Sequence, residues 1–370
     1  MYFQVGKPVS GINFTGRENE IRDLLQLLKN GQSAVLIAPR RYGKTSVILN
    51  VFEQLKRDKI FTSYIDIFSI ADIKRLAEQL TNTILENKKL EKLIISIKKN
   101  VGDIFKNIEF KSTVEEYEFL LKFGQTEINQ WELLENTLDF AEKFAFHNSK
   151  LLVIGVDEFG DIEKLGSDNL VKLLRSKMQQ QKNVVYLFSG SYESVMNHLF
   201  TTVRSPFYRF ARIIKLGNIS KKSFEAFYIS KLIEFNINYN LKLINLILDY
   251  TKGHPYYSSL FLQQWLFNGN VLVNSDIDAF FMLLDTVLDI EKPYLEKLWE
   301  DVSSQKDQRM LIVSLAEGNK PYAARDGKRI NISRVINKLE QKSLIIKSGR
   351  NWVFTDPLFE TWIRKVVLKE

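Results

Sequence analysis

The chain contains no cysteine in its 370 residues, which removes two classes of protein at once. Neither disulfide-stabilised domains nor zinc sites with thiolate ligands can form. The three histidines, His147, His198 and His254, lie far apart in the sequence, so a histidine metal cluster is not expected. No apolar run approaches the ~20 residues of a membrane-spanning helix, and residues 1–11 lack the apolar core of a signal peptide. We therefore expect a cytoplasmic protein that does not contact a membrane.

The composition is otherwise that of an ordinary globular protein, with 45% hydrophobic and 26% charged residues. The length predicts two or three domains. The net charge is +8, and residues 305–370 hold 14 lysines and arginines against seven acidic residues. Nearly all of the positive excess therefore lies in the last 66 residues. A basic terminal module predicts contact with nucleic acid or another polyanion; the alternative is a surface that is merely soluble.

Apolar periodicity predicts strands that alternate with helices over the first part of the chain. This alternation is typical of a parallel sheet with helices on both faces. Residues 89–128, rich in Lys, Ile and Phe, are predicted to be an insertion of helices with a hairpin, and residues 220–300 to be several helices. The predicted strands are 33–38, 61–68, 151–159 and 184–190, and the predicted helices are 18–29, 45–55, 71–88, 129–148 and 167–180.

Residues 38–45, A-P-R-R-Y-G-K-T, match the phosphate-loop pattern G-x-x-x-x-G-K-[ST] at every fixed position except the first. Loop N–H groups and the start of the next helix would cradle a phosphate of ATP. Lys44 would reach the β- and γ-phosphates, Thr45 would bind Mg²⁺, and Ser46 would reach the α-phosphate. Alanine can replace the first glycine if φ stays negative; the alternative is an incidental GKT turn. The predicted nucleotide-binding residues here are Ala38, Pro39, Arg40, Arg41, Tyr42, Gly43, Lys44, Thr45 and Ser46.

Two adjacent acids, Asp157 and Glu158, close an apolar strand about 110 residues after the loop. Beside a phosphate loop, the first acid is expected to orient the Mg²⁺ shell together with Thr45. The second is expected to polarise the attacking water. The pair therefore predicts ATP hydrolysis rather than binding alone, although an acidic turn in solvent is the alternative.

Further candidates for contact with the γ-phosphate follow the next strand. Ser189 or Ser191 could hydrogen-bond to it, with Ser189 as the first choice; a turn that caps the helix after Tyr192 is the alternative. The segment 203–212 contains three arginines, of which Arg209 is the candidate to approach the γ-phosphate. It would act within one chain or from a neighbouring subunit, so either a monomer or a nucleotide-dependent oligomer is expected.

Taken in order, FTGRENE (14–20), APRRYGKTS (38–46), LLVIGVDEF (151–159), FSGS (188–191), SPFYRFAR (205–212) and KGHPYY (252–257) resemble the archaeal-type ATPase family. That family is close to the STAND signalling ATPases and the origin-recognition AAA+ proteins. The resemblance implies a P-loop α/β ATPase domain over 1–218, a helical lid over 219–302 and a winged-helix domain over 303–370. It implies that Gly16 and Arg17 lie by the adenine or ribose and that Pro255 packs beside the base.

The basic C-terminal module itself reads as two helices, 306–317 and 332–345, followed by two strands around the turn 348–351. This order is a winged helix-turn-helix pattern. Segment 321–331, where a middle helix should be, is polar and contains a glycine. Such domains bind double-stranded DNA, and the alternative is docking of a protein partner. The predicted DNA-contacting residues are Ser333, Arg334, Asn337, Lys338, Lys342 and Arg350.

Two functions remain open on these grounds. The first is an ATP-hydrolysing switch, with slow or partner-stimulated turnover, whose nucleotide state controls a DNA-binding winged helix. The second is a signalling ATPase whose C-terminal domain docks a protein.

Overall fold

The computed structural model describes residues 5–87, 108–111, 120–123, 129–268, 275–321 and 331–369. The chain divides into two compact units. The α/β unit consists of Arg17–Arg40 and Lys44–Leu216. The C-terminal unit consists of Gly217–Glu370 together with Met1–Gly16 and Arg41–Gly43. Three residues in the middle of the predicted phosphate loop therefore belong to a different unit from the residues on either side of them.

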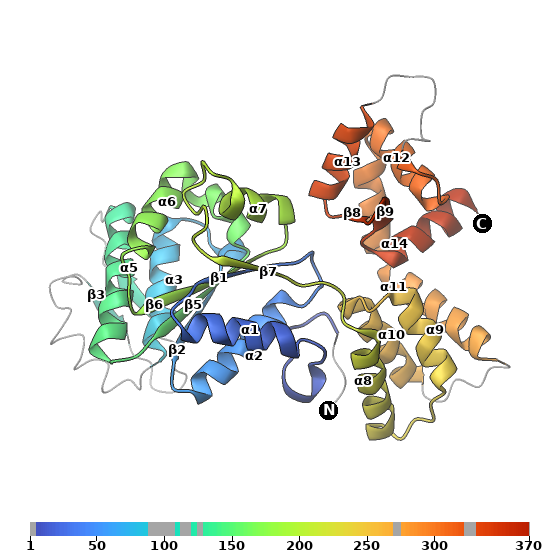
Figure 1. Cartoon of the computed structure of the whole chain (residues 1–370), viewed down its shortest axis with the longest axis horizontal. Helices are drawn as coiled ribbons and strands as arrows, with labels where there is room; N and C mark the ends of the chain where they lie inside the picture. Colours follow the sequence, from blue (N-terminus) through green and yellow to red (C-terminus); the bar gives the residue numbers. More distant parts are fainter. Residues whose placement is uncertain are drawn as a thin grey trace. The chain divides into compact units, whose positions relative to one another are not determined.

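A five-stranded parallel sheet forms the centre of the α/β unit, in the order β2-β5-β6-β1-β7 (Figure 1). Every residue of the three inner strands is buried, as expected for a parallel sheet that is covered on both faces. The outer strands contain partly exposed residues. The strands are β1 (Ala34–Ile37), β2 (Phe61–Asp66), β5 (Leu152–Asp157), β6 (Val184–Gly190) and β7 (Arg212–Lys215).

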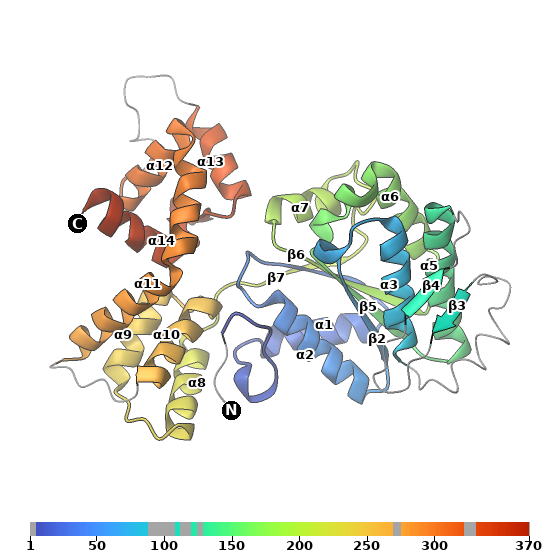
Figure 2. The ribbon, with the colours of Figure 1, turned by 180° about the vertical axis from the view of Figure 1, so that it is seen from behind.

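Helices cover both faces of this sheet (Figures 1 and 2). On one face lie α1 (Glu18–Lys29) and α2 (Lys44–Arg57), and on the other lie α3 (Ile73–Leu85), α5 (Gln130–His147) and α6 (Glu163–Met178). Helix α7 (Glu193–Thr201) follows β6. The predicted alternation of strands and helices is thus confirmed. In the predicted insertion, β3 (Ile108–Lys111) and β4 (Leu120–Phe123) pair antiparallel, which confirms the hairpin, while the helices expected there lie outside the described residues.

An aromatic cluster anchors the segment that follows β5. Phe159 comes directly after the two predicted acids and is fully buried. Its ring lies 4.6 Å from that of Phe188, 5.9 Å from that of Phe200 and 5.2 Å from that of Phe207, measured between centroids. Burying one phenylalanine side chain stabilises a protein by about 1.5–3 kcal/mol. The cluster therefore fixes the backbone next to Asp157 and Glu158.

The C-terminal unit is helical over most of its length, with one apolar cluster that runs from Ile219 to Ile363. The helices α12 and α13 and a β8–β9 hairpin follow one another along the chain, while residues 322–330, within the expected middle helix, lie outside the described part. The winged-helix domain therefore stays a prediction. The elements are α8 (Lys221–Glu234), α9 (Leu241–Thr251), α10 (Pro255–Asn268), α11 (Asp276–Ser303), α12 (Lys306–Ala316), α13 (Ile332–Gln341), β8 (Ile345–Ser348), β9 (Asn351–Phe354), α14 (Pro357–Trp362) and a final π-helical segment, Ile363–Leu368.

Among the residues that the structure describes, none of the helices combines the length and the hydrophobicity that crossing a membrane requires. The division of the chain into domains at 218 and 302 stays a prediction.

Candidate nucleotide site

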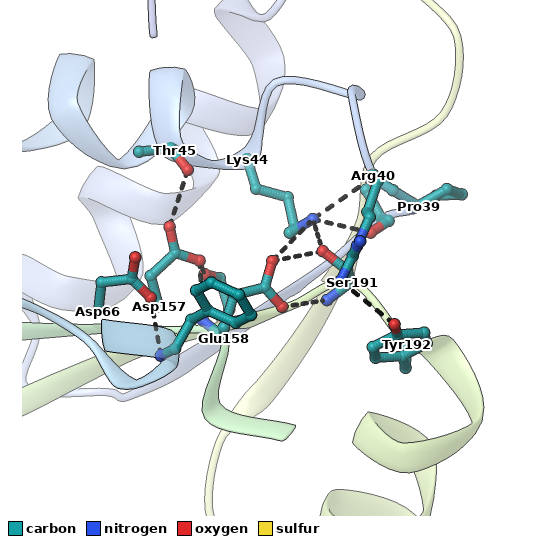
Figure 3. A network of polar contacts seen from close by, with 12 residues as sticks. Pro39, Arg40, Lys44, Thr45, Asp66, Asp157, Glu158, Ser191 and Tyr192 are labelled. Atoms are coloured by element: carbon teal, nitrogen blue, oxygen red, sulfur yellow. Dashed lines mark hydrogen bonds and ion pairs between the residues drawn. The ribbon is translucent and has the colours of Figure 1, made fainter. Parts of the chain in front are cut away.

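The carboxyl ends of three neighbouring strands bring four of the predicted site residues together, Lys44, Thr45, Asp157 and Glu158 (Figure 3). Strand β1 leads into the phosphate loop, β5 ends at Asp157, and β6 ends at Gly190. The register pairs Ile37 of β1 with Gly190, and Asp66 of β2 with Asp157. Parallel strands place their carboxyl ends at one edge, which is where open α/β sheets bind ligands.

Lys44, the first residue of α2, lies buried among oxygen atoms at this edge. Its Nζ donates to the carbonyl oxygens of Ala38 and Pro39, at 3.1 and 3.4 Å, and to Ser191 Oγ at 2.7 Å. Burial lowers the pKa of Lys44, and the negative charges of Glu158 and Asp157 oppose that effect. The loop thus bends around the ammonium group and holds it beside both acids.

The backbone of the loop explains why alanine can stand at its first position. Ala38 is buried and is not among the described residues with positive φ, so its methyl group causes no backbone strain. The left-handed positions are Arg41 (φ 68°) and Gly43 (φ 83°) instead. Alternation of left- and right-handed residues turns successive N–H groups toward one point, which makes a concave anion site.

Asp157 is 3% exposed, and its carboxylate accepts four hydrogen bonds. Thr45 Oγ1 and Tyr64 OH both donate to Oδ2 at 2.8 Å. Ser189 Oγ and the N–H of Glu158 donate to Oδ1. Burial and the charge of Asp157 raise the pKa of Tyr64 well above its ordinary value, so the hydroxyl keeps its proton. A buried carboxylate needs such donors, and here they fix its orientation.

Glu158 differs from its neighbour in exposure and in partners. Its backbone is left-handed (φ 48°), and its side chain is 28% exposed. The carboxylate accepts from the N–H of Ser191 at 3.1 Å and from Ser191 Oγ, and it lies 3.9 Å from Lys44 Nζ. One acid is therefore buried and held by four donors, while the other is partly exposed to solvent.

The hydroxyl of Thr45 and the carboxylate of Asp157 offer oxygen ligands, which are the kind that Mg²⁺ prefers. Thr45 Oγ1 and Asp157 Oδ2 are 2.8 Å apart, so both oxygens would be within reach of a single divalent cation. Within the described ranges, no group of three or more His, Asp or Glu side chains could hold a metal by itself. Phosphate and water oxygens would have to complete the shell, as is usual for Mg²⁺ at nucleotide sites.

Sequence reasoning missed two residues at this edge. Tyr64 donates to Asp157, and Asp66 is paired with it in the sheet register. Burial raises the pKa of Asp66, and the nearby carboxylates, Asp157 first, raise it further. Both residues lie on β2, and the sequence contains no signal that this strand pairs with β5.

The two serines after β6 have different surroundings. Ser189, the first choice for a γ-phosphate contact, is fully buried and donates to Asp157. Ser191 contacts both Lys44 and Glu158. The structure thus brings Ser191 closer than Ser189 to the groups predicted to act on the γ-phosphate.

Another predicted loop residue, Arg40, donates to Tyr192 OH at 3.2 Å.

Arg209 is exposed and has a left-handed backbone (φ 54°). Its guanidinium lies 5.2 Å from the ring of Tyr208, and its N–H donates to the carbonyl of Phe200 at 3.1 Å. Across the described part of the chain, no hydrogen bond or ion pair joins it to Lys44 or to either acid. Its predicted role at the γ-phosphate stays a prediction.

The remaining predicted nucleotide contacts have clear structural surroundings. Arg17 is buried and pairs with Glu20 at 3.1 Å, and Ser46 is buried on α2. In the C-terminal unit, a Cβ on Gly16 would lie 2.2 Å from Ile219 Cγ2, and one on Gly253 would lie 2.0 Å from the Ile219 carbonyl oxygen. Both glycines are therefore needed for close packing. Pro255 is the first residue of α10, a position that suits proline.

The predicted DNA-contacting residues all lie on the surface of the C-terminal unit. On α13, the buried residues Ile332, Val335, Ile336 and Leu339 form the inner face. Four of the predicted residues, at 333, 334, 337 and 338, are exposed on the same helix, and Arg350 lies in the turn between β8 and β9. Lys342 pairs with Asp301 at 3.4 Å.

Comparisons with known proteins agree with this geometry. The model of a family described as an ATPase domain predominantly from Archaea matches residues 14–260. The chain is similar in structure to the Walker-type ATPase of Pyrococcus abyssi, with 18% identity, a TM-score of 0.69, and coverage of 98% of this chain and 100% of that chain. It is also similar to the ORC2 protein of Aeropyrum pernix in ADPNP–ADP complexes, with 10% identity, a TM-score of 0.52, and coverage of 96% and 95%. At these identities the likeness shows the fold, that of a P-loop NTPase. A search of curated proteins gave no match.

Proposed function

Because the chain belongs to the family of ATPase domains found predominantly in Archaea, we propose that it binds ATP with Mg²⁺ and hydrolyses it to ADP and phosphate. The observation that carries this proposal is the network of Lys44, Thr45, Asp157, Glu158 and Ser191 at the carboxyl edge of the sheet. It combines a phosphate-binding lysine, two oxygen donors for a divalent cation and a second, partly exposed carboxylate.

Each of these residues has a defined task in the proposed reaction. The loop N–H groups and Lys44 would bind the β- and γ-phosphates, and Thr45 and Asp157 would hold the cation. Mg²⁺, when bound, supplies positive charge to the β- and γ-phosphate oxygens. Glu158 orients a water molecule and accepts a proton from it as the water oxygen bonds to the γ-phosphorus and the bond from that phosphorus to the ADP oxygen breaks.

Ser191 is positioned to control this step. It donates to the carboxylate of Glu158 through both its N–H and its hydroxyl, and it accepts from Lys44. A carboxylate that accepts these bonds is a weaker partner for water. Slow turnover that rises when Glu158 is released from Ser191 follows from this arrangement.

The experiment that tests the proposal measures ATP binding and phosphate release separately. We expect Glu158→Gln to retain ATP affinity and to lose about 100-fold or more in turnover, the usual contribution of a general base. Glu163→Gln, an exposed neighbour at the start of α6, is the matched control and should leave both unchanged. Removal of Mg²⁺ with a chelator should stop phosphate release. Full turnover in Glu158→Gln would exclude this residue as the base.

We further propose that nucleotide state controls a contact between the C-terminal unit and double-stranded DNA. The supporting observations are the +7 charge of residues 305–370 and the exposed polar and basic face of α13. Hydrogen-bonding and basic residues on the outer face of one helix are what a DNA-reading helix presents to the groove. The other candidate is a signalling ATPase, of the STAND type, whose C-terminal elements dock a protein partner. ATPase activity measured with and without duplex DNA separates the two, because only the first predicts stimulation by DNA.

A further inference from the structure

Arg41, in the middle of the phosphate loop, packs among the residues of the C-terminal unit. Its Nη1 lies 2.5 Å from Glu291 Oε2 on α11. The guanidinium carbon lies 4.3 Å from the ring centre of Tyr256 and 4.1 Å from that of Tyr294. The hydroxyl of Tyr256 donates to the other oxygen of Glu291 at 2.6 Å. We call Glu291, Tyr256 and Tyr294 the arginine socket.

The charge and the aromatic surfaces of the arginine socket suit a single guanidinium group. Glu291 is 5% exposed, and both of its carboxylate oxygens have donors, one from Arg41 and one from Tyr256. Aromatic faces attract a guanidinium group, and two of them contact this one. Arg41 also has a left-handed backbone, which is unfavourable for arginine and persists only where surrounding contacts hold it. The socket supplies those contacts.

A second set of contacts runs from the next loop residue toward the end of the chain. The ring of Tyr42 lies 4.6 Å from that of His254, and the ring of His254 lies 4.7 Å from that of Tyr257. The hydroxyl of Tyr257 donates to Asp356 Oδ2 at 2.5 Å. The other carboxylate oxygen, Oδ1, accepts from the N–H groups of Leu358 and Phe359, at 2.9 and 3.0 Å, and so caps α14.

We propose that the arginine socket positions the phosphate loop through Arg41, and that the path from Tyr42 to Asp356 transmits nucleotide occupancy to the start of α14. This inference rests on the proposed function, since a nucleotide must bind the loop. The N–H groups of residues 41–43 are part of the loop that would cradle phosphate, so phosphate and socket act on the same backbone. Because the arginine socket and a bound phosphate act on the same loop backbone, their effects are coupled in both directions. The socket alters the affinity for nucleotide, and bound nucleotide alters the contacts of Arg41 in the socket. Glu291 is thus a positioning residue.

A double-mutant cycle tests the socket. Binding of ADP with Mg²⁺ is measured by calorimetry in the full chain, in Arg41→Gln, in Glu291→Gln and in the double variant. We expect each single variant to weaken binding by about tenfold, within the usual range of coupling between sites, and the double variant to be no weaker than the singles. The double variant leaves no unpaired buried charge, so it carries the test if a single variant fails to fold. Glu296→Gln, exposed on the same helix, is the control.

Hydrogen exchange of the amides of Leu358 and Phe359, with and without ADP, tests the path. In the wild-type chain we expect ADP to change their exchange rates several-fold, and in Tyr42→Leu, which removes the ring contact with His254, we expect no change at saturating ADP. Wild-type affinity in a folded Glu291→Gln variant, additive effects of the two single variants, or an ADP response of α14 that survives in Tyr42→Leu would each overturn the proposal. A wild-type chain that binds no nucleotide would overturn the proposed function as well, which distinguishes the two failures.

Discussion

The carboxyl edge of the sheet and the outer face of α13 are both rich in polar side chains, but they are organised differently. At the sheet edge, the side chains bond to one another: Asp157 accepts four hydrogen bonds, and Lys44 donates three. On α13, Arg334 and Lys338 are exposed and extend from a helix whose other face is buried. The contacts at the sheet edge fix the positions of individual polar groups, as a chemical reaction requires. The exposed face of α13 indicates only that a partner would carry negative charge.

The largest effect is expected from Lys44→Ala, which removes the ammonium group at the centre of the sheet edge. We expect ATP affinity to fall by at least about 100-fold, roughly 3 kcal/mol, because charge-assisted bonds to phosphate are lost. Calorimetric titration with ATP and Mg²⁺ measures the effect. Lys56→Ala, exposed near the other end of α2, is the control and should bind normally. Unchanged affinity in Lys44→Ala would mean that residues 38–45 are not a phosphate loop.

The outer face of α13 is tested by reversing its charge. We expect Arg334→Glu combined with Lys338→Glu to weaken binding to duplex DNA by about tenfold or more and to flatten its dependence on salt, because fewer counterions are released. Fluorescence anisotropy at several salt concentrations measures both quantities. Lys242→Glu, an exposed residue at the start of α9, changes charge elsewhere in the C-terminal unit and should have a smaller effect. If the variant binds DNA as the wild type does, α13 does not contact DNA, and protein docking becomes the better hypothesis.

A smaller effect is expected from Tyr64→Phe, which removes one of four donors to Asp157. One hydrogen bond contributes about 0.5–1.5 kcal/mol, so we expect turnover to fall about three- to tenfold and the Mg²⁺ requirement to rise, with ATP affinity little changed. Tyr186→Phe is a matched control, because it also loses a hydrogen bond, to Gln181 at 2.6 Å, but Tyr186 is not one of the four donors to Asp157 in the described part of the chain. Identical Mg²⁺ dependence in the two variants would show that Tyr64 does not position Asp157.

The sequence predicted the strands, the helices and the loop well because each is set by local pattern. Strand β5 is six buried residues that end at an acid, and a continuous apolar run of that length carries its own signal. The same holds for α1, whose apolar face and bounds agree with the prediction of a helix over 18–29. The roles predicted for Lys44 and Asp157 follow from the motif and the strand end, and the structure brings the two residues to one edge.

What the sequence could not predict depends on contacts between distant residues. Tyr64 reaches Asp157 because β2 pairs with β5, and Arg41 reaches Glu291 across 250 positions of sequence. Ser191 is a predicted candidate for the γ-phosphate, yet in the structure it bonds to Glu158, an acid whose backbone is left-handed. No periodicity encodes such pairings, since they are set by sheet order and by the tertiary packing of helices.

The last effect is one on stability rather than on function, and it is expected at Asp356, which accepts hydrogen bonds from Tyr257 and from two amides of α14. Burial raises the pKa of Asp356 from 3.8 to about 6, although Tyr257 and the α14 amides oppose this shift. The folded chain therefore holds this proton more tightly than the unfolded chain, and the free energy of unfolding contributed by Asp356 falls as pH rises from about 4 to about 6.

Asn caps helices as well as Asp does, so Asp356→Asn should remove this loss of stability. We expect the variant to gain on the order of 1–2 kcal/mol relative to wild type between pH 4 and pH 7, less than the full shift implies because the residue is partly exposed. His254, whose pKa burial lowers to about 3, contributes the opposite trend in both proteins and cancels in the difference. Urea unfolding at several pH values measures this difference, and parallel pH curves for the two proteins would show that burial does not raise the pKa of Asp356.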